Sequence, residues 1–238
     1  MLVLLPSSKT LSFQIKEFSL VTLPQLIDFT KDLHKTYSSY SIEEISKKMK
    51  CSESIAKKTY GQFQEMQFPH TISNAAPALY TFKGDVYKHV GVEDYSKKDL
   101  DFAQKHLRIL SGFYGVLRPL DLMQPYRLEM ALTVSFWKEK VTDLIDNEKD
   151  EIIVNLASME YFNVCKNTKK KVITPVFKED KNGVYKIVTI YTKYARGLMA
   201  DWIIKNKITR PDDLKKFSLQ GYSYSDDLSD GDVIVFVR

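Results

Sequence analysis

Short apolar runs that stop at polar residues or proline predict the strands of a buried sheet. Leu2 to Leu5 ends at Pro6, Ile152 to Val154 runs straight into Asn155, and Ala78 to Phe82 precedes a lysine and a glycine. Runs of this length and composition are typical of strands that are covered on both faces. We therefore expect all three runs to lie in one mostly buried sheet.

A second strand signal lies in the last third of the chain. Lys171 to Lys178 and Val184 to Tyr191 flank the dipeptide Asn182-Gly183, which favours a type I′ hairpin turn. Pro175 cannot donate a ladder hydrogen bond, so it predicts an edge or bulged strand for the first arm. Because its strands also carry lysines, we expect this hairpin to be partly exposed.

Helical spacing of apolar residues fills most of the remaining chain. The clearest helix begins at Ser96, where Ser-x-x-Asp approximates a capping box and Leu107 and Leu110 continue the apolar stripe. Thr22, Ser41 and Ser52 are candidate amino-terminal caps. Further helices are expected at Pro24 to Lys35, Ser41 to Phe63, Ser135 to Asn147 and Lys193 to Asn206, and a last strand at Val233 to Val237.

Strands interspersed with helices predict an α/β or α+β fold. We expect a mixed central sheet with surrounding helices and a peripheral β-hairpin. The expected domain is a single compact one that spans residues 1 to 238 and carries a basic cleft.

Composition adds a weak constraint on partners. Lysine and arginine outnumber aspartate and glutamate by 35 to 30, an excess that permits nucleic-acid or phosphate binding without requiring it. No apolar run approaches the roughly 18 residues of a membrane span, and the first residues lack the features of a signal peptide. The sequence therefore predicts a water-soluble protein without a membrane partner.

Standard catalytic and metal-binding motifs are absent from the sequence. Phosphate-binding glycine loops, the nucleophile elbow of hydrolases and the HExxH motif do not occur. The two cysteines, Cys51 and Cys165, are far apart, and the histidines lack ligand spacing. We therefore expect no cofactor and no stoichiometric metal site. The four histidines are His34, His70, His89 and His106.

Candidate functional residues recur where apolar segments end or break. Each of them, taken alone, could be a cap, a turn residue or a surface charge. Clefts in open sheets form beyond strand ends, so we expect the set to converge on one basic cleft. Pro119 and Pro125 would stiffen the segment between two of its arginines. The set comprises Lys9, Lys83, Asp85, Arg118, Arg127, Glu129, Asn155, Ser158 and Arg196.

Four long and unusual blocks follow one another along the chain. They are FKGDVY at Phe82 to Tyr87, LRILSGFYGVLRPLDLMQPYRLEM at Leu107 to Met130, NLASMEY at Asn155 to Tyr161 and ARGLM at Ala195 to Met199. With these blocks the chain resembles the YaaA family of bacterial peroxide stress proteins. One departure lies near the amino terminus, where the family usually reads SPAKT and this chain has PSSKT at residues 6 to 10.

The resemblance implies a cytoplasmic protein that protects against hydrogen peroxide and lowers the damaging pool of intracellular iron. It also implies non-specific binding of double-stranded DNA through a basic cleft with a helix-hairpin-helix element. The segment most similar to that element is Leu107 to Leu120, with a helix that ends at Leu110 and a turn from Gly112 to Gly115. A rigid turn that lines a small-molecule pocket is the alternative interpretation of these glycines.

Two hypotheses about function remain open. In the first, the protein is not an enzyme, and its cleft grips the DNA backbone. That hypothesis predicts that affinity falls steeply with salt and does not depend on DNA sequence. The cleft itself predicts that Arg118→Ala and Arg127→Ala abolish peroxide protection and leave the melting temperature nearly unchanged. The residues expected to bind DNA or another anion are Lys9, Lys83, Arg108, Gly112, Gly115, Arg118, Tyr126, Arg127, Asn155, Ser158 and Arg196.

In the second hypothesis, the same cleft belongs to an enzyme that acts on a nucleotide, a nucleobase or another phosphate-bearing metabolite. Carboxylates repel phosphate backbones, so DNA binding alone does not need Asp85 and Glu129. Either could serve as a general base while an arginine orients a small anionic substrate. Both could equally be ion-pair partners that hold Arg118 and Arg127 in place.

Overall fold

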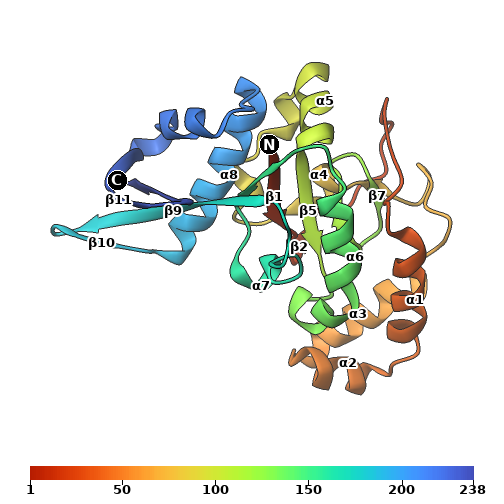
Figure 1. Cartoon of the computed structure of the whole chain (residues 1–238). Coiled ribbons are helices and arrows are strands. Elements are labelled where there is room, and N and C mark those ends of the chain that lie inside the picture. The colour runs from red at the N-terminus through yellow and green to blue at the C-terminus, as the bar shows by residue number, and fades with distance from the viewer.

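The fold is built on a mixed eight-stranded sheet in the order β11-β12-β9-β8-β1-β5-β6, with β10 paired to β9. The computed structural model describes all residues from 1 to 238 (Figure 1). The inner strands run parallel, whereas β6, β10 and β11 pair antiparallel to their neighbours. The strands are β1 Leu2–Pro6, β5 Leu107–Ser111, β6 Gly115–Leu117, β8 Ile152–Asn155, β9 Lys171–Lys181, β10 Val184–Lys186, β11 Ser223–Asp230 and β12 Val233–Val237.

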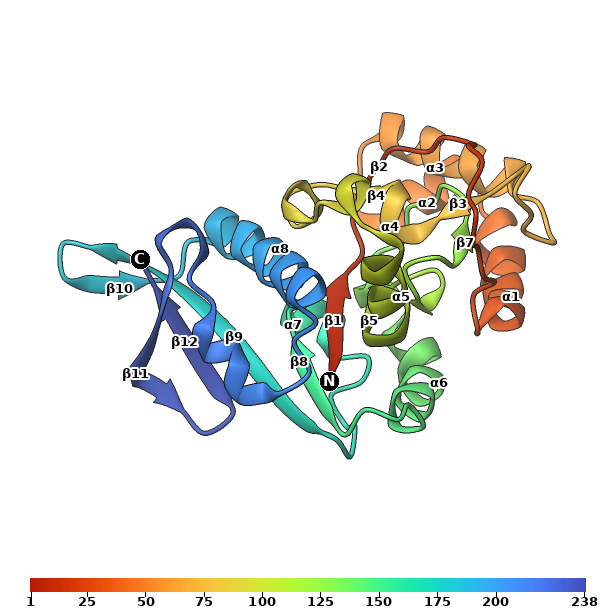
Figure 2. The same cartoon turned by 90° about the horizontal axis from the view of Figure 1, so that it is seen from above.

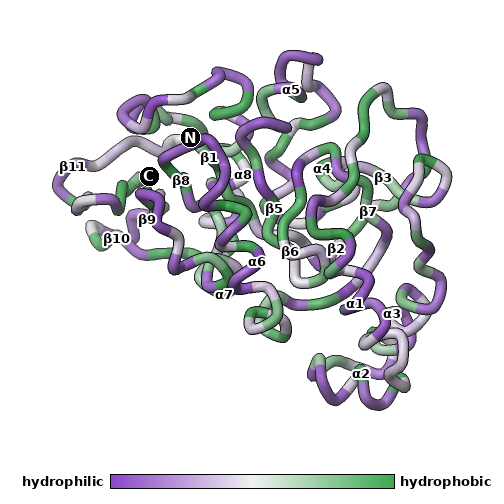
Figure 3. Tube along the Cα trace, turned by 45° about the vertical axis from the view of Figure 1, so that its right-hand side comes forward, coloured by the Kyte–Doolittle hydropathy of each residue, from purple (hydrophilic) through white to green (hydrophobic).

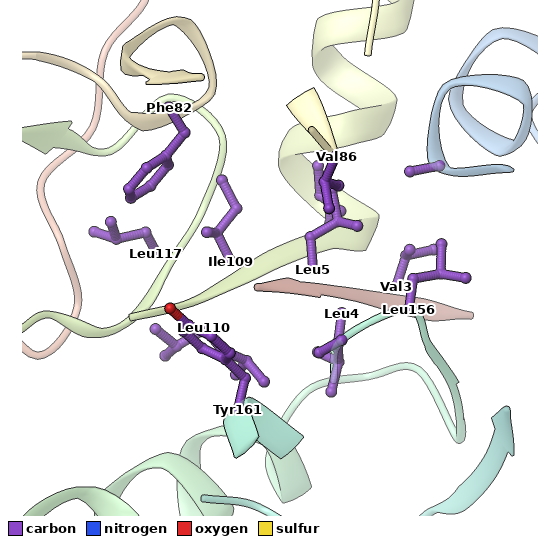
Figure 4. Close-up of a cluster of buried hydrophobic side chains, with 14 of the residues drawn as sticks. Val3, Leu4, Leu5, Phe82, Val86, Ile109, Leu110, Leu117, Leu156 and Tyr161 are labelled. Atoms are coloured by element: carbon purple, nitrogen blue, oxygen red, sulfur yellow. The ribbon is translucent and has the colours of Figure 1, made fainter. Parts of the chain in front are cut away.

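The middle of this sheet is buried on both faces. All five residues of β1 are buried, as expected for a continuous apolar strand. Leu5 and Ile109 point to the face that packs against Phe82, whereas Leu4 and Leu110 point to the face covered by Tyr161 (Figure 4). The α/β class with a mixed central sheet is confirmed, and so are the predicted strands at Leu2 to Leu5 and Ile152 to Val154.

The predicted helices are all present. Ser41 and Ser96 form complete capping boxes and Ser52 caps α3, but Thr22 is not a cap, because its hydroxyl donates to Asp121 at 2.6 Å. The α-helices are α1 Ile27–Ser38, α2 Ile42–Met49, α3 Glu53–Glu65, α4 Ala78–Thr81, α5 Lys97–His106, α6 Val134–Asp146, α7 Met159–Phe162 and α8 Thr189–Asn206.

Some helices lie toward the two ends of the molecule, whereas α5 and α6 flank the central strands (Figures 1 and 2). Helices α1 to α3 gather at one end, whereas α8 lies against β9 at the other (Figures 1 and 2). None of the helices combines the length and the hydrophobicity that crossing a bilayer would need.

The prediction of a strand at Ala78 to Phe82 is wrong. The segment forms the short helix α4, whose Thr81 hydroxyl donates to the Pro77 carbonyl oxygen at 2.9 Å. A buried apolar run of this length fits a helical turn as well as a strand. Strand β4, Phe82–Lys83, pairs instead with β2, Thr10–Leu11, outside the central sheet, and a second small sheet joins β3, Ala76–Pro77, to β7, Leu122–Met123.

The prediction of a helix-hairpin-helix element at Leu107 to Leu120 is also wrong. Helix α5 ends at His106, and the segment continues as the antiparallel pair β5 and β6 inside the central sheet. A Cβ atom at Gly112 would lie 2.3 Å from the Leu128 carbonyl oxygen, and one at Gly115 would lie 2.8 Å from the Trp137 ring. These glycines therefore serve a buried turn, and their backbone does not face a surface ligand.

The predicted hairpin is confirmed in its turn and its exposure, but its second arm is shorter than predicted, because β10 ends at Lys186 and α8 begins at Thr189. Asn182 and Gly183 have φ values of 57° and 82°, as a type I′ turn requires, and Tyr185 is 43% exposed. The edge assignment from Pro175 is wrong, because β9 lies between β8 and β12. Pairing with β8 ends at Ile173, so the missing N–H at Pro175 costs no ladder bond on that side.

Strands β2, β3, β5, β6 and β7 were not predicted, and neither was β11. Its sequence SYSDDLSD is mostly hydrophilic, as the pale and purple trace in Figure 3 shows. It pairs only with β12, at the outer edge of the sheet, where polar residues are tolerated.

Candidate functional site

A cavity of about 380 Å³ opens at the carboxyl ends of β1 and β8, and we call it the Arg196 pocket. Open α/β sheets commonly bind ligands at this edge. The loop after β1, the segment after β4, the start of α7 and one face of α8 form its walls. Its lining consists of Pro6, Ser7, Ser8, Lys9, Thr10, Gly84, Asp85, Val86, Tyr87, Ser158, Glu160, Tyr161, Lys193 and Arg196.

Two glycines allow these walls to approach each other. Gly84 has a φ of +114°, and a Cβ atom there would lie 2.5 Å from the Ser8 hydroxyl oxygen. A Cβ atom at Gly197 would lie 1.9 Å from the Val86 carbonyl oxygen, so α8 packs directly against the segment after β4 (Figure 2). This close packing brings Asp85 and Arg196 into one cavity.

A second cavity of about 190 Å³ adjoins the first, and we call it the Arg127 pocket. Lys9 lines both cavities, so we refer to them together as the Lys9 groove. Helix α3 contributes one wall of the second cavity. Its lining consists of Lys9, Leu11, Ile55, Lys58, Thr59, Gln62, Tyr126 and Arg127.

Glu129 links the two cationic side chains that meet at this junction. Its Oε1 atom accepts from Lys9 Nζ at 3.0 Å and from Arg127 Nη2 at 3.1 Å. The side chain is only 12% exposed, yet its second oxygen, Oε2, has no partner. Glu129 therefore holds the two cations in place with half of its accepting capacity unused.

Buried polar atoms without partners gather in this part of the molecule. Buried polar atoms normally find a hydrogen-bond partner, and an exception often marks a functional site or an absent ligand. Only five side-chain atoms in the protein are exceptions, and four belong to residues that line the Lys9 groove or contact Lys9. The five atoms are Gln62 Oε1, Arg127 Nε, Glu129 Oε2, Thr192 Oγ1 and Arg196 Nε.

Arg196 is the most unusual of these residues. Burial lowers the pKa of its guanidinium, and no neighbouring carboxylate opposes that effect. The other charges of the pocket are partly paired, since Asp85 lies 3.0 Å from Lys88 Nζ and 3.9 Å from Lys193 Nζ. A guanidinium that has no carboxylate partner and is partly shielded from water is a favourable binding group for an anion.

Buried tyrosines line both cavities, with Tyr87 and Tyr161 in the Arg196 pocket and Tyr126 in the Arg127 pocket. Burial raises the pKa of Tyr126 and of Tyr161, and hydrogen bonding with Ser7 partly opposes both shifts. Tyr126 also bonds to the Ser111 hydroxyl at 2.7 Å, and Tyr87 donates to the Pro6 carbonyl oxygen at 2.8 Å. These phenols stay neutral at physiological pH and offer hydrogen bonds without adding charge.

The structure brings together most of the residues singled out from the sequence. Lys9, Asp85, Ser158 and Arg196 line the Arg196 pocket, whereas Tyr126 and Arg127 line its neighbour. Asn155 lines neither cavity, and its side-chain oxygen accepts from the Ala157 N–H at 3.0 Å. Lys83 lies outside the Lys9 groove and lines a smaller, separate cavity beside Glu93.

Two predicted arginines lie elsewhere and have structural partners. Arg108 is 4% exposed at the amino end of β5, and its Nε donates to Glu148 at 2.7 Å. Arg118 bonds to the buried Asp121 at 2.9 Å and to the Leu23 carbonyl oxygen. We therefore correct both assignments, because a partner in the fold already occupies each guanidinium.

The sequence reasoning missed several residues of the groove. Ser7 and Ser8 precede the candidate Lys9, and Tyr87 and Tyr161 lie inside the sequence blocks that carry the family resemblance. The missed residues that carry a charge are Lys58, Glu160 and Lys193. These residues come from segments far apart in the sequence, and only the folded structure shows that they lie in one groove.

A family model described as peroxide stress protein YaaA matches residues 1–228. The chain belongs to the YaaA family. The match includes every residue that lines the Lys9 groove, so this YaaA-family protein carries the groove within its family domain. No group of three or more histidine, cysteine, aspartate or glutamate side chains lies close enough together to hold a metal ion.

Proposed function

We propose that this peroxide stress protein binds the backbone of double-stranded DNA without reading its sequence. The observation that carries the proposal is the convergence of five cations from distant segments on the Lys9 groove. Phosphate contacts from lysine and arginine supply most of the affinity in non-specific DNA binding. The five cations are Lys9, Lys58, Arg127, Lys193 and Arg196.

In this proposal the helix pair α2–α3 adds exposed lysines to the binding surface and takes the role that the sequence had suggested for Leu107 to Leu120, although Lys57 is paired with Glu53 at 2.7 Å. A tight turn joins the two helices, with Lys50 in a left-handed conformation at φ 48° and Ser52 as the cap of α3. Lys58 connects the pair to the groove. The exposed lysines of the pair are Lys47, Lys48, Lys50, Lys57 and Lys58.

The proposal also gives a reason for limited damage by intracellular iron. A protein that covers the sugar-phosphate backbone reduces the access of iron and oxidant to DNA, and this effect needs no iron site in the protein. Cells that produce a binding-deficient variant should therefore lose peroxide protection although the protein is folded.

The test is the salt dependence of binding to a short DNA duplex. Removing one phosphate contact should lower the slope of log affinity against log salt by about 0.9. We expect the double variant Lys9→Ala/Lys58→Ala to lower the slope by about 1.8, equally for scrambled sequences. Lys171→Ala is the matched control, because this exposed lysine lies at the amino end of β9. A wild-type protein that does not bind DNA at low salt would refute the proposal.

A further inference from the structure

The loop from Ser7 to Thr10 presents hydrogen-bond donors that the protein does not use. The backbone N–H groups of Ser8 and Lys9 donate to no protein atom. The Ser158 hydroxyl, at the amino-terminal cap position of α7, makes no capping hydrogen bond. All three residues line the Arg196 pocket, so several donors remain available at the carboxyl edge of the sheet.

Arg196 adds the strongest donor to the same pocket. Its Nε is buried without a partner, and its guanidinium forms no ion pair in the protein. Lys9 contributes an ammonium group that contacts only one oxygen of Glu129. A bound anion would satisfy these groups and offset the cost of their partial burial.

We propose that the Arg196 pocket binds the phosphate monoester group of a small metabolite. A phosphate monoester offers three strong acceptor oxygens and nearly two negative charges, whereas a carboxylate offers two oxygens and one charge. The donors from Ser8, Lys9, Ser158 and Arg196 exceed what a carboxylate uses. The pocket volume of about 380 Å³ falls within the usual range for small-molecule sites.

The acidic residues of the pocket indicate what the rest of the ligand carries. Asp85 and Glu160 line the pocket together with the cations and can accept hydrogen bonds from hydroxyl or amino groups. A sugar phosphate or a nucleoside monophosphate has both features. This inference goes beyond DNA binding, because internal DNA phosphates are diesters with a single charge.

The experiment is isothermal titration of the full-length protein with adenosine monophosphate, inorganic phosphate and adenosine. We expect the two phosphate-bearing probes to bind at one site per chain and adenosine not to bind. Arg196→Met should weaken binding of the monophosphate by at least about 30-fold, as expected when a buried charge partner is removed. Lys205→Ala, on the same helix and paired with Asp201, should leave the affinity unchanged.

A second variant keeps the inference testable if the first variant does not fold. If Arg196→Met does not fold, Lys9→Met should weaken binding of the monophosphate by several-fold. Equal binding of adenosine and the monophosphate, no binding of either phosphate probe, or full affinity in the folded Arg196→Met protein would overturn the inference.

The same assay can distinguish a phosphate group at the end of a DNA strand from one on a free metabolite. Competition by a single-stranded oligonucleotide that depends on its 5′-phosphate would assign the site to strand ends, whereas stronger binding of the free monophosphate would assign it to a metabolite. Failure of the proposed DNA binding is distinguishable, because it would appear as an unchanged salt slope in Lys9→Ala/Lys58→Ala.

Discussion

The parallel strands of the central sheet begin at one side of the sheet, which we call its amino edge, and end at the other, its carboxyl edge. Similar charged residues lie at both edges, but their pairing is very different. At the amino edge, Arg108 donates to Glu148 at 2.7 Å, and Asp150 accepts from both the amino terminus at 2.7 Å and His106 at 3.0 Å. At the carboxyl edge, three charged residues in or beside the Lys9 groove, Arg127, Glu129 and Arg196, each carry a buried side-chain polar atom without a partner. The same residue types thus serve structure at one edge and remain available at the other.

The difference teaches how to separate structural from functional charges in this fold. A charge whose hydrogen bonds are complete stabilises the native state, and removing its partner leaves a costly buried group. A charge whose hydrogen bonds are incomplete contributes little to the stability of the free protein and gains a partner when a ligand binds. We therefore expect substitutions of charged residues to lower the free energy of unfolding at the amino edge and to change it little at the carboxyl edge.

The largest expected effect is at the amino edge. Arg108→Ala leaves the Glu148 carboxylate, which is 20% exposed, without its cation. We expect a loss of about 3 kcal/mol in the free energy of unfolding and a melting temperature lower by about 10 °C. Chemical denaturation measures the loss, with Lys171→Ala as the control. A loss below about 1 kcal/mol would remove the contrast between the two edges.

Strong local patterns of the sequence were sufficient for much of the fold. The strand at Leu2 to Leu5, the capping box at Ser96 and the Asn182-Gly183 turn were each predicted from a local pattern, and each prediction is confirmed. The apolar stripe of α5, in contrast, continues past the helix end at His106 into β5. Periodicity alone could not locate that boundary, because the pairing of β5 with β1 decides it.

Part of the candidate site could be predicted because its residues follow strand ends, whereas Arg196, which also lines the pocket, lies inside α8. Lys9 and Ser158 follow strands directly, and they do lie in the Arg196 pocket. Arg108 and Arg127 are indistinguishable as residue types, and only the tertiary structure shows that Arg108 meets Glu148, 40 residues away. The pairing state of a charge is therefore a property of the fold that the sequence does not display.

A smaller effect is expected when the amino edge is titrated with acid. Burial acts to raise the pKa of Asp150, but the ammonium of the amino terminus and His106 outweigh it, so the pKa lies below its usual value of 3.8. A lowered pKa means that Asp150 stabilises the fold above about pH 4 and that this contribution is lost as the pH falls further.

Asp150→Asn should accordingly be less stable than the wild type at pH 7, by about 1 kcal/mol for a partly exposed pair. The gap should narrow below pH 4, and urea denaturation between pH 7 and pH 3 measures it. A gap that does not change with pH would show that the carboxylate charge is not what stabilises this edge.

The smallest effect on stability is expected at the carboxyl edge, at Arg196. Because its guanidinium has no ion pair and its Nε is already without a partner, replacing it should remove no favourable contact of the free protein. We expect Arg196→Met to change the free energy of unfolding by no more than about 0.5 kcal/mol, or to stabilise the protein slightly. Gly197→Ala, one residue away, is the positive control, because its Cβ would lie 1.9 Å from the Val86 carbonyl oxygen and should destabilise by about 2 kcal/mol. A loss of about 2 kcal/mol in Arg196→Met would instead make Arg196 a structural residue like Arg108, and the distinction between the two edges would fail.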